Sequence, residues 1–231
     1  IQRWQSLVDD RVDRIPLQHL LGTAEFCGLA FEINSSVLVP RPETELLAEA
    51  AWAVAAIKEE SVVLDIGTGS GCLAVSVAVH AEETTIHALD ISTAAINVAR
   101  ANAERHGVAE RIIFHEGDAR VALPGTCLFD VIVSNPPYIP SAEIESLQIE
   151  VRDHDPRLAL DGGLDGLEFY RSLAVSCLSR LRSDGRLLLE VGDGQGEVVA
   201  DLITAQGGRV LEILPDLNNI ERIVVASSDN S

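Results

Sequence analysis

The residues best suited to chemistry lie in one short turn, which reads Asn135-Pro136-Pro137-Tyr138 and follows a run of β-branched residues. Neither proline has an N–H group, so the carbonyls of Asn135 and Pro136 are acceptors with no donor beside them. The Asn135 side-chain oxygen is a further acceptor, and Tyr138 offers a flat ring. Such a turn could hold the two hydrogens of a planar –NH2 group, as in a carboxamide or an adenine, and direct its nitrogen at an electrophile. For an isolated Asn-Pro-Pro, an ordinary strand-ending turn would be the simpler explanation.

A second turn combines glycines with small polar residues, and its members are Gly67, Thr68, Gly69, Ser70 and Gly71. It links a strand-like run at 62–66 to a helix-like run. Glycine lets a ligand approach the backbone closely, and the N–H groups at a helix N-terminus attract a carboxylate. Cys72 stands where the dinucleotide-binding fingerprint requires its third glycine. The loop therefore fits S-adenosylmethionine (SAM), which has a carboxylate and no pyrophosphate, better than NAD.

Three acidic residues accompany the same predicted strands. Asp90 ends the second strand, where a carboxylate can accept both hydroxyls of a ribose; capping the next helix is the alternative. Asp118 and Ala119 follow the third strand at the level of an adenine edge, although a solvated loop acid is the simpler explanation of Asp118. Asp65 precedes the glycine turn and either contacts the ligand or supports the turn from behind. Each signal is weak alone, but together with Asn135 they predict a SAM site.

The positions of these turns follow from an alternation of strand and helix patterns that begins at Val62. Strands are expected at 62–66, 84–89, 112–115, 129–134, 186–191, 210–214 and 222–226, and helices at 43–57, 70–79, 92–106, 168–181 and 195–205. This order predicts an α/β fold with a mostly parallel, doubly wound sheet, in which ligands lie at the carboxyl ends of the strands. Residues 23–42 are expected to form a β-hairpin ahead of it. The segment 139–167 is expected to be a long loop, of a length that usually has a function.

Composition limits the classes of function. The chain has 231 residues, 47% of them hydrophobic, which is enough for a sizeable core. No apolar run is long enough to cross a bilayer. The four cysteines have no paired spacing, which argues against a zinc site or disulfide framework and fits a reducing cytoplasm. The net charge of −19, with no basic run, disfavours a stable complex with nucleic acid. A solvated surface explains this charge better than a basic protein partner does.

Together, these motifs resemble those of the bacterial HemK-type protein-glutamine methyltransferases, which modify peptide-chain release factors. The resemblance covers nearly the whole chain and includes three more stretches, at 16–22 (Pro-Leu-Gln-His-Leu-Leu-Gly), 39–45 (Val-Pro-Arg-Pro-Glu-Thr-Glu) and 155–163 (Asp-Pro-Arg-Leu-Ala-Leu-Asp-Gly-Gly). The stretch at 39–45 discriminates best, because general SAM folds and most adenine methyltransferases lack it. Residues 217–222 depart from the pattern, which more often has a glycine there.

The resemblance implies a Rossmann-like class I SAM-dependent methyltransferase domain over residues 43–231, with an antiparallel last strand. It implies SAM as the methyl donor, no metal, and a cytoplasmic enzyme whose substrate is the glutamine of a Gly-Gly-Gln motif in release factors. It also implies that residues 1–22 are a connector from an N-terminal helical domain that contacts the release factor. Because the chain contains no methionine, even at position 1, we expect that domain to be missing from this sequence. No direct contact with nucleic acid or membrane is expected.

By resemblance, site roles fall on individual residues. Those expected to bind SAM are Asp65, Gly67, Thr68, Gly69, Ser70, Gly71, Asp90, Asp118, Ala119 and Asn135. Those expected to hold the glutamine are Asn135, Pro136, Pro137, Tyr138, Arg41 and Glu43. Asn135, Pro136 and Tyr138 are expected to act in catalysis. Arg41 and Glu43 have an alternative role, as an ion pair and helix cap that hold the hairpin to the core.

Three other functions remain compatible with these motifs. The same turn could act on a flipped adenine at N6 in nucleic acid, although the acidic charge argues against it. A ribosomal-protein glutamine could also be the substrate, and only the sequence of the stretch 39–45 argues against it. A non-enzymatic SAM-binding module is the third, and the intact Asn-Pro-Pro-Tyr turn argues against loss of activity.

Overall fold

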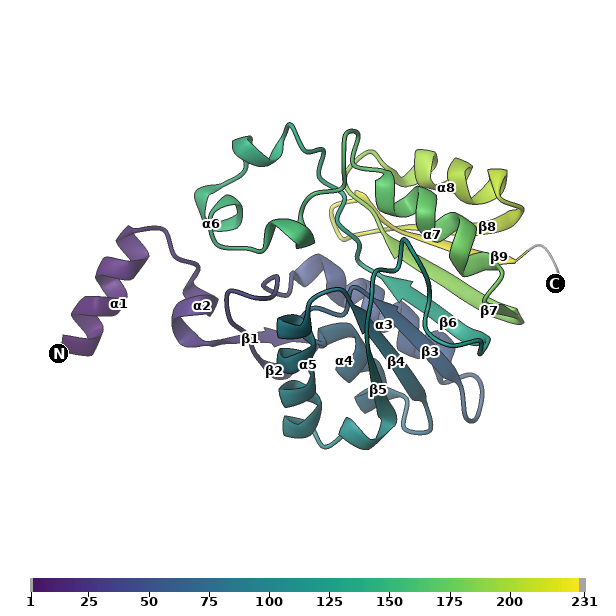
Figure 1. Cartoon of the computed structure of the whole chain (residues 1–231), viewed down its shortest axis with the longest axis horizontal. Helices are drawn as coiled ribbons and strands as arrows, with labels where there is room; N and C mark the ends of the chain where they lie inside the picture. The colour runs from purple at the N-terminus through teal and green to yellow at the C-terminus, as the bar shows by residue number, and fades with distance from the viewer. Residues whose placement is uncertain (1, 229–231) are drawn as a thin grey trace.

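Short runs of β-branched and leucine residues form a seven-stranded sheet in the computed structural model, which describes residues 2–228 (Figure 1). The strands are β3 (Val62–Ile66), β4 (Thr85–Asp90), β5 (Ile112–Glu116), β6 (Phe129–Ser134), β7 (Leu181–Glu190), β8 (Gly208–Pro215) and β9 (Glu221–Ser228). Their order is β5-β4-β3-β6-β7-β9-β8. The pairs from β5 to β7 are parallel, and β9 runs antiparallel to both of its neighbours. The predicted fold class is therefore confirmed.

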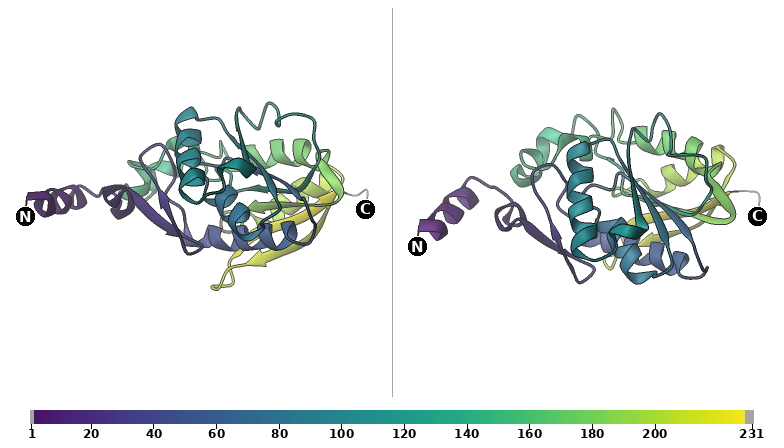
Figure 2. Two further views of the ribbon diagram at one scale, coloured as in Figure 1. Left: turned by 90° about the horizontal axis from the view of Figure 1, so that it is seen from below. Right: turned by 60° about the horizontal axis from the view of Figure 1, so that its bottom comes forward.

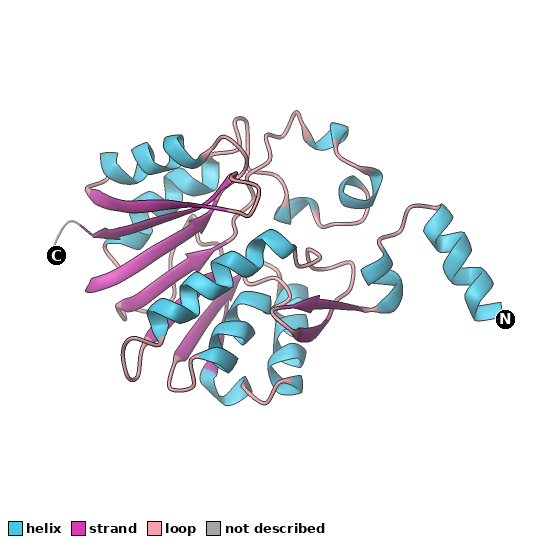
Figure 3. Cartoon of the chain, turned by 180° about the vertical axis from the view of Figure 1, so that it is seen from behind, coloured by secondary structure: helices cyan, strands magenta, loops and turns pink. Residues whose placement is uncertain are grey.

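Helices cover both faces of this sheet (Figure 3). One face packs against α3 (Pro42–Ala55), α4 (Cys72–His80) and α5 (Thr93–Arg105), and the other against α7 (Glu168–Leu178) and α8 (Gly196–Ala205). Parallel strands need crossover connections, which place helices on both sides and bury the strands completely. In β6, Val131 and Val133 belong to the first core and Ile132 to the second, and all three are fully buried. The turn that follows β6 is thus mounted on a rigid central strand.

The N-terminal part forms an arm beside the sheet, and Figure 2 shows α1 projecting away from the body. It consists of α1 (Gln2–Val12), α2 (Leu17–Leu21) and the antiparallel hairpin of β1 (Thr23–Phe26) and β2 (Leu29–Glu32). The predicted hairpin is therefore present, but it ends at Glu32 and does not extend to residue 42 as expected. Phe26 and Phe31 are buried and meet edge to face, with ring centroids 6.1 Å apart. These rings join the hairpin to the core, and residues 33–41 then run to the start of α3.

Some boundaries differ from those expected. Leu181, expected to end a helix, begins the ten-residue strand β7 instead. The register with β6 shifts between Phe129 and Val131, and a Cβ on Gly185 would lie only 2.9 Å from the Phe129 carbonyl oxygen. Residues 182–185 form this irregularity, which explains why their polar sequence is typical of a turn. The long loop at 139–167 is confirmed, and it contains the short helices η2 (Ile144–Ser146), α6 (Ile149–Arg152) and η3 (Arg157–Ala159). The remaining short helix is η1 (Ala109–Arg111).

Candidate active site

A cavity of about 680 Å³ opens where β3, β4, β5 and β6 end, which is the edge of the sheet that binds ligands in this fold class. Its size suits a small-molecule site. The expected site residues that line it are Gly67, Gly69, Asp90, Asp118, Ala119, Asn135, Pro136 and Pro137. Further lining residues lie outside the site prediction, and among them are two segments, 36–38 before α3 and 156–159 within the long loop. The remaining expected residues, Asp65, Thr68, Ser70, Gly71, Tyr138, Arg41 and Glu43, lie behind or beside this wall.

In the glycine turn between β3 and α4, one glycine faces open space and another lies close to a neighbouring helix. The N–H groups of Gly67 and Thr68 both donate to the Leu89 carbonyl, at 2.8 and 3.0 Å, which ties the turn to β4. Gly67 has φ 75°, and a Cβ there would meet nothing within 4 Å, so the backbone faces open space. Gly71 has φ 79°, and its Cβ would lie 3.0 Å from the Cβ of Ala99 on α5. The first glycine therefore leaves room for a ligand, and the last permits α4 and α5 to pack.

Asp65 supports this turn from within the protein. Its side chain is fully buried, and its Oδ2 accepts hydrogen bonds from Thr68 Oγ1 at 2.6 Å and from the Ala74 N–H at 3.2 Å. Burial raises the pKa of Asp65 to about 7, although these two hydrogen bonds oppose the shift. Of the two roles that the sequence left open, this geometry matches support of the turn.

Asp90 presents its carboxylate at the cavity wall. Its Oδ2 accepts the Gly69 N–H and its Oδ1 accepts the Ser92 N–H, both at 2.9 Å. The side chain that caps α5 belongs to Ser92, whose Oγ accepts from the Ala95 N–H. Each carboxylate oxygen can accept more than one hydrogen bond, so both keep lone pairs for hydroxyl groups of a ligand. Asp90 thus fits the ribose of SAM.

The loop after β5 is held by an arginine that the site prediction did not include. Arg120 binds the Asp118 carboxylate, with its Nη2 2.8 Å from Oδ2, and this contact lowers the pKa of Asp118. The same guanidinium reaches Glu168 at 3.0 Å and lies over the Phe169 ring, 4.9 Å from its centroid. Arg120 therefore joins this side of the cavity to the start of α7, and the Asp118 carboxylate is already partnered within the protein.

The Asn135 amide is oriented by a neighbour on α3. Its Nδ2 donates to Thr44 Oγ1 at 3.0 Å. Because the amide nitrogen is used inside the protein, Oδ1 remains as the acceptor for a ligand. The hydroxyl of Ser134 donates to the Ile66 carbonyl at 2.8 Å and fixes the end of β6 to β3. Thr44 belongs to the stretch 39–45 that the sequence singled out, but only the fold reveals its contact with Asn135.

Tyr138 packs behind the turn. It is half-buried, and its carbonyl accepts the Gln195 Nε2 at 3.0 Å. A Cβ on Gly192 would lie 3.0 Å from the Tyr138 ring, so the ring rests against the backbone that follows β7. Burial raises the pKa of Tyr138, and the phenol is therefore neutral near pH 7.

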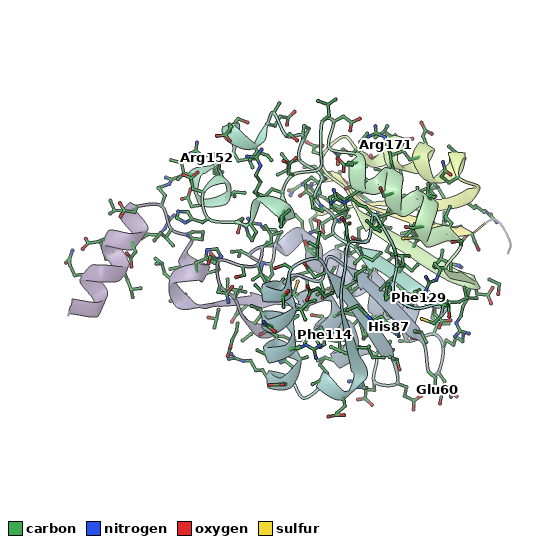
Figure 4. The ribbon with its side chains drawn as sticks, in the orientation of Figure 1. Glu60, His87, Phe114, Phe129, Arg152 and Arg171 are labelled. Atoms are coloured by element: carbon green, nitrogen blue, oxygen red, sulfur yellow. The ribbon has the colours of Figure 1, made fainter. Side chains whose placement is uncertain are left out.

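Arg41 pairs with a residue distant in sequence. Its guanidinium contacts Asp155, whose side chain is only 1% exposed and also accepts the Val39 N–H. The partner is Asp155 rather than Glu43, which is exposed in the first turn of α3. Arg41 thus anchors the long loop whose residues 156–159 wall the cavity. Figure 4 shows Arg152 of the same loop on α6, above the arm.

Two histidines on β4 and the edge strand β5 lie outside this site. His115 Nε2 and His87 Nδ1 are 3.0 Å apart with the rings stacked, and His87 meets Phe129 edge-on (Figure 4). None of the three lines the cavity.

Across residues 2–228, no three His, Cys, Asp or Glu side chains gather in a way that could hold a metal ion. No helix in that range has the length and apolarity to span a membrane.

Comparison with known proteins places the chain in a family. The profile of the methyltransferase small domain matches residues 42–153. A release factor glutamine methyltransferase from Geobacter sulfurreducens is 45% identical over 220 residues, which are 95% of this chain and 76% of that protein. The chain belongs to the release factor glutamine methyltransferases. Another member, from Moorella thermoacetica, is 42% identical over 224 residues, covering 96% of this chain and 78% of that protein.

Solved structures outside this family share the architecture. A ribosomal protein L11 methylase from Lactobacillus delbrueckii subsp. bulgaricus superposes with a TM-score of 0.61, over 85% of this chain and 83% of that one, at 19% identity. At this identity the likeness concerns the fold alone. The family and the fold make the chain a SAM-dependent methyltransferase. The cavity suits SAM, because the open backbone at Gly67 and the free lone pairs of Asp90 match its polar groups.

Proposed function

We propose that this release factor glutamine methyltransferase moves the methyl group of SAM to the side-chain amide nitrogen of the glutamine in the Gly-Gly-Gln motif of release factors. The observation that carries the proposal is the hydrogen bond from Asn135 Nδ2 to Thr44 Oγ1. It leaves Oδ1 as an acceptor at the cavity wall, beside Pro136 and Pro137, which bring no N–H group. A carboxamide NH2 group, with two donors, is complementary to such a wall.

The mechanism depends on positioning. An amide nitrogen is a poor nucleophile because its lone pair is delocalised into the carbonyl. SAM, when bound, supplies a methyl group on a positively charged sulfur. Asn135 Oδ1 and the Pro136 carbonyl accept the two amide hydrogens, fix the nitrogen in line with that methyl group and add electron density to it. Transfer would leave the neutral thioether product of SAM, and the surplus proton of the amide would pass to water, so no strong general base is required.

The remaining site residues divide between direct contact and support. Gly67, Gly69, Asp90, Asp118 and Ala119 form the side that holds SAM. Asp65, Thr68, Ser70 and Gly71 keep the glycine turn in shape, and Tyr138 buttresses the turn after β6. The segments 36–38 and 156–159 flank the path of the peptide. Arg41 holds the second of these segments through Asp155, and Glu43 contributes to the start of α3.

The domain organisation follows from the same proposal. Residues 43–231 form the methyltransferase domain, residues 23–42 carry the hairpin, and residues 1–22 connect to an N-terminal helical domain that contacts the release factor. Three ion pairs link the arm and the start of α3 to the long loop: Arg11 and Arg14 with Glu150, and Arg41 with Asp155. The site and the docking region are thereby joined. An enzyme acting on release factors works in the cytoplasm.

Methyl transfer from labelled SAM tests the proposal directly. The chain is incubated with a release factor, with the same factor carrying Asn in place of the Gly-Gly-Gln glutamine, with ribosomal proteins, and with an adenine-containing oligonucleotide. Label is expected on the intact release factor alone. Label on the variant factor, or transfer only to ribosomal protein or oligonucleotide, would contradict it, and SAM binding without any transfer would indicate a binding module.

A further inference from the structure

A buried acid lies next to the Asn135 turn. Glu190 ends β7, and the register that pairs Ser134 of β6 with Leu189 of β7 places Glu190 alongside Asn135. Its side chain is buried, the residue being 3% exposed, and its Oε2 has no hydrogen-bond partner among the described residues. An ionisable carboxyl in such a place is costly unless it is partnered. The transfer reaction as derived above does not use it.

Glu190 is linked to the side chains of both Thr44 and Asn135. Hydrogen bonds from the side chains of Thr44 and Asn135 both favour the ionised form of Glu190. Thr44 is also 3% exposed and lies in the first turn of α3. A hydroxyl has a single hydrogen, so Thr44 can accept from Asn135 Nδ2 while it donates to Glu190. A carboxylate only accepts, and it therefore sets the direction of both bonds.

We propose that Glu190, acting through Thr44, is a positioning residue that holds the Asn135 amide with its oxygen toward the substrate. The inference rests on the proposed function. Protonation gives Glu190 a donor of its own, and the Thr44 hydroxyl can then turn and donate to Asn135 instead. The Asn135 amide is free to rotate by half a turn, and its NH2 group would then meet the NH2 group of the glutamine. Methyl transfer consequently needs ionised Glu190.

The surroundings place this titration near neutrality. Burial raises the pKa of Glu190 to about 7, and Glu43 on α3 adds to the rise, while Thr44, Arg222 and Asn135 oppose it. The groups that face Glu190 from the packed elements are Glu43, Arg222 of β9, Tyr138 and Tyr170 of α7. Burial raises the pKa of both tyrosines, and Arg222 is held charged by Asp216. None of these three changes charge near pH 7.

The rate of a single turnover at saturating SAM and release factor, followed between about pH 5.5 and about pH 8.5, reports this ionisation. Asp65, whose pKa burial also raises to about 7, lies behind the glycine turn, so its titration affects SAM binding, and saturation removes that effect. The parent rate is expected to rise about tenfold per pH unit below about pH 7 and to level off above it. Glu190→Gln is expected to lack this inflection and to be roughly 10- to 100-fold slower at high pH.

Thr44 provides a second route to the same test. Thr44→Val is expected to slow transfer about as much as Glu190→Gln, with the SAM dissociation constant unchanged, and Thr44→Ser to recover most of the rate. Thr84→Val is the matched control. Thr84 is equally buried, and its hydroxyl bonds Ser61 at 3.2 Å where β4 begins, at the opposite edge of the sheet. It should keep the parent pH profile.

Each outcome bears on the inference. Loss of the inflection in Glu190→Gln and slow transfer in Thr44→Val, with recovery by serine, support it. An unchanged inflection in Glu190→Gln, or a Thr44→Val enzyme as fast as Thr84→Val, would overturn it and leave the proposed function standing. A parent chain that binds SAM and never methylates the glutamine would instead overturn the proposed function, and this inference with it.

Discussion

Replacing Asp90 by alanine should separate SAM binding from the stability of the fold. The carboxylate accepts the N–H groups of Gly69 and Ser92 and is proposed to accept two ribose hydroxyls. A hydrogen bond to a charged group contributes roughly 1.5–3 kcal/mol. Two such bonds to the ribose amount to about 3–6 kcal/mol. Because Asp90 is half-buried and water weakens the bonds, the lower end of this range, about 3 kcal/mol, applies. The SAM dissociation constant should therefore rise roughly 100-fold.

Calorimetric titration with SAM measures this change, and thermal unfolding reports the fold. Asp130→Ala is the matched control, because Asp130 also accepts a backbone N–H, that of Val62 at 2.9 Å, but where β6 begins. Both variants should lose stability, and only Asp90→Ala should lose SAM affinity. Equal dissociation constants for Asp90→Ala and the parent would refute the assignment of Asp90 to the ribose.

Three further predictions concern the turns and the buried acid. Gly71→Ala should lower the free energy of unfolding by roughly 1–3 kcal/mol in urea titrations, because its Cβ would lie 3.0 Å from that of Ala99; an unchanged midpoint would contradict the packing argument. Asn135→Ala should lower kcat roughly 10²- to 10³-fold with little change in SAM affinity, and near-normal turnover would disprove the proposed mechanism. As the pH rises from about 4.5 to about 7, the free energy of unfolding should fall less in Glu190→Gln than in the parent. In the parent the folded chain keeps the Glu190 proton up to about pH 7, whereas the unfolded chain releases it near its ordinary pKa of 4.5. The difference in slope should accumulate to as much as about 3 kcal/mol, and parallel curves would show that Glu190 is not perturbed.

The sequence predicted the sheet well because its signals are local. Alternating strand and helix patterns, the glycine turn and the two prolines after β6 each depend on neighbouring residues. The start of β7 was missed because residues 182–185 have turn chemistry and lie in the irregularity between the Leu181 and Arg186 pairings with β6.

Contacts that depend on distant residues were harder to foresee. Arg41 pairs with Asp155 and Asn135 with Thr44, across separations of 114 and 91 residues. Glu190 had one visible signal, an acid at the carboxyl end of a leucine-rich strand, where side chains face ligands. Its effect on Asn135 emerges only when β6, β7 and α3 are brought together.

The most direct test is the location of the transferred methyl group. Fragment-ion mass spectrometry of the Gly-Gly-Gln peptide, taken from a release factor after reaction with the chain and SAM, should show one methyl on the glutamine side-chain amide. After the same short reaction time, the Asn135→Ala variant should give a methyl yield that is lower in proportion to its kcat, roughly 10²- to 10³-fold. A methyl on any other residue, or an equal yield from the variant, would contradict a site in which Asn135 presents its oxygen to the glutamine.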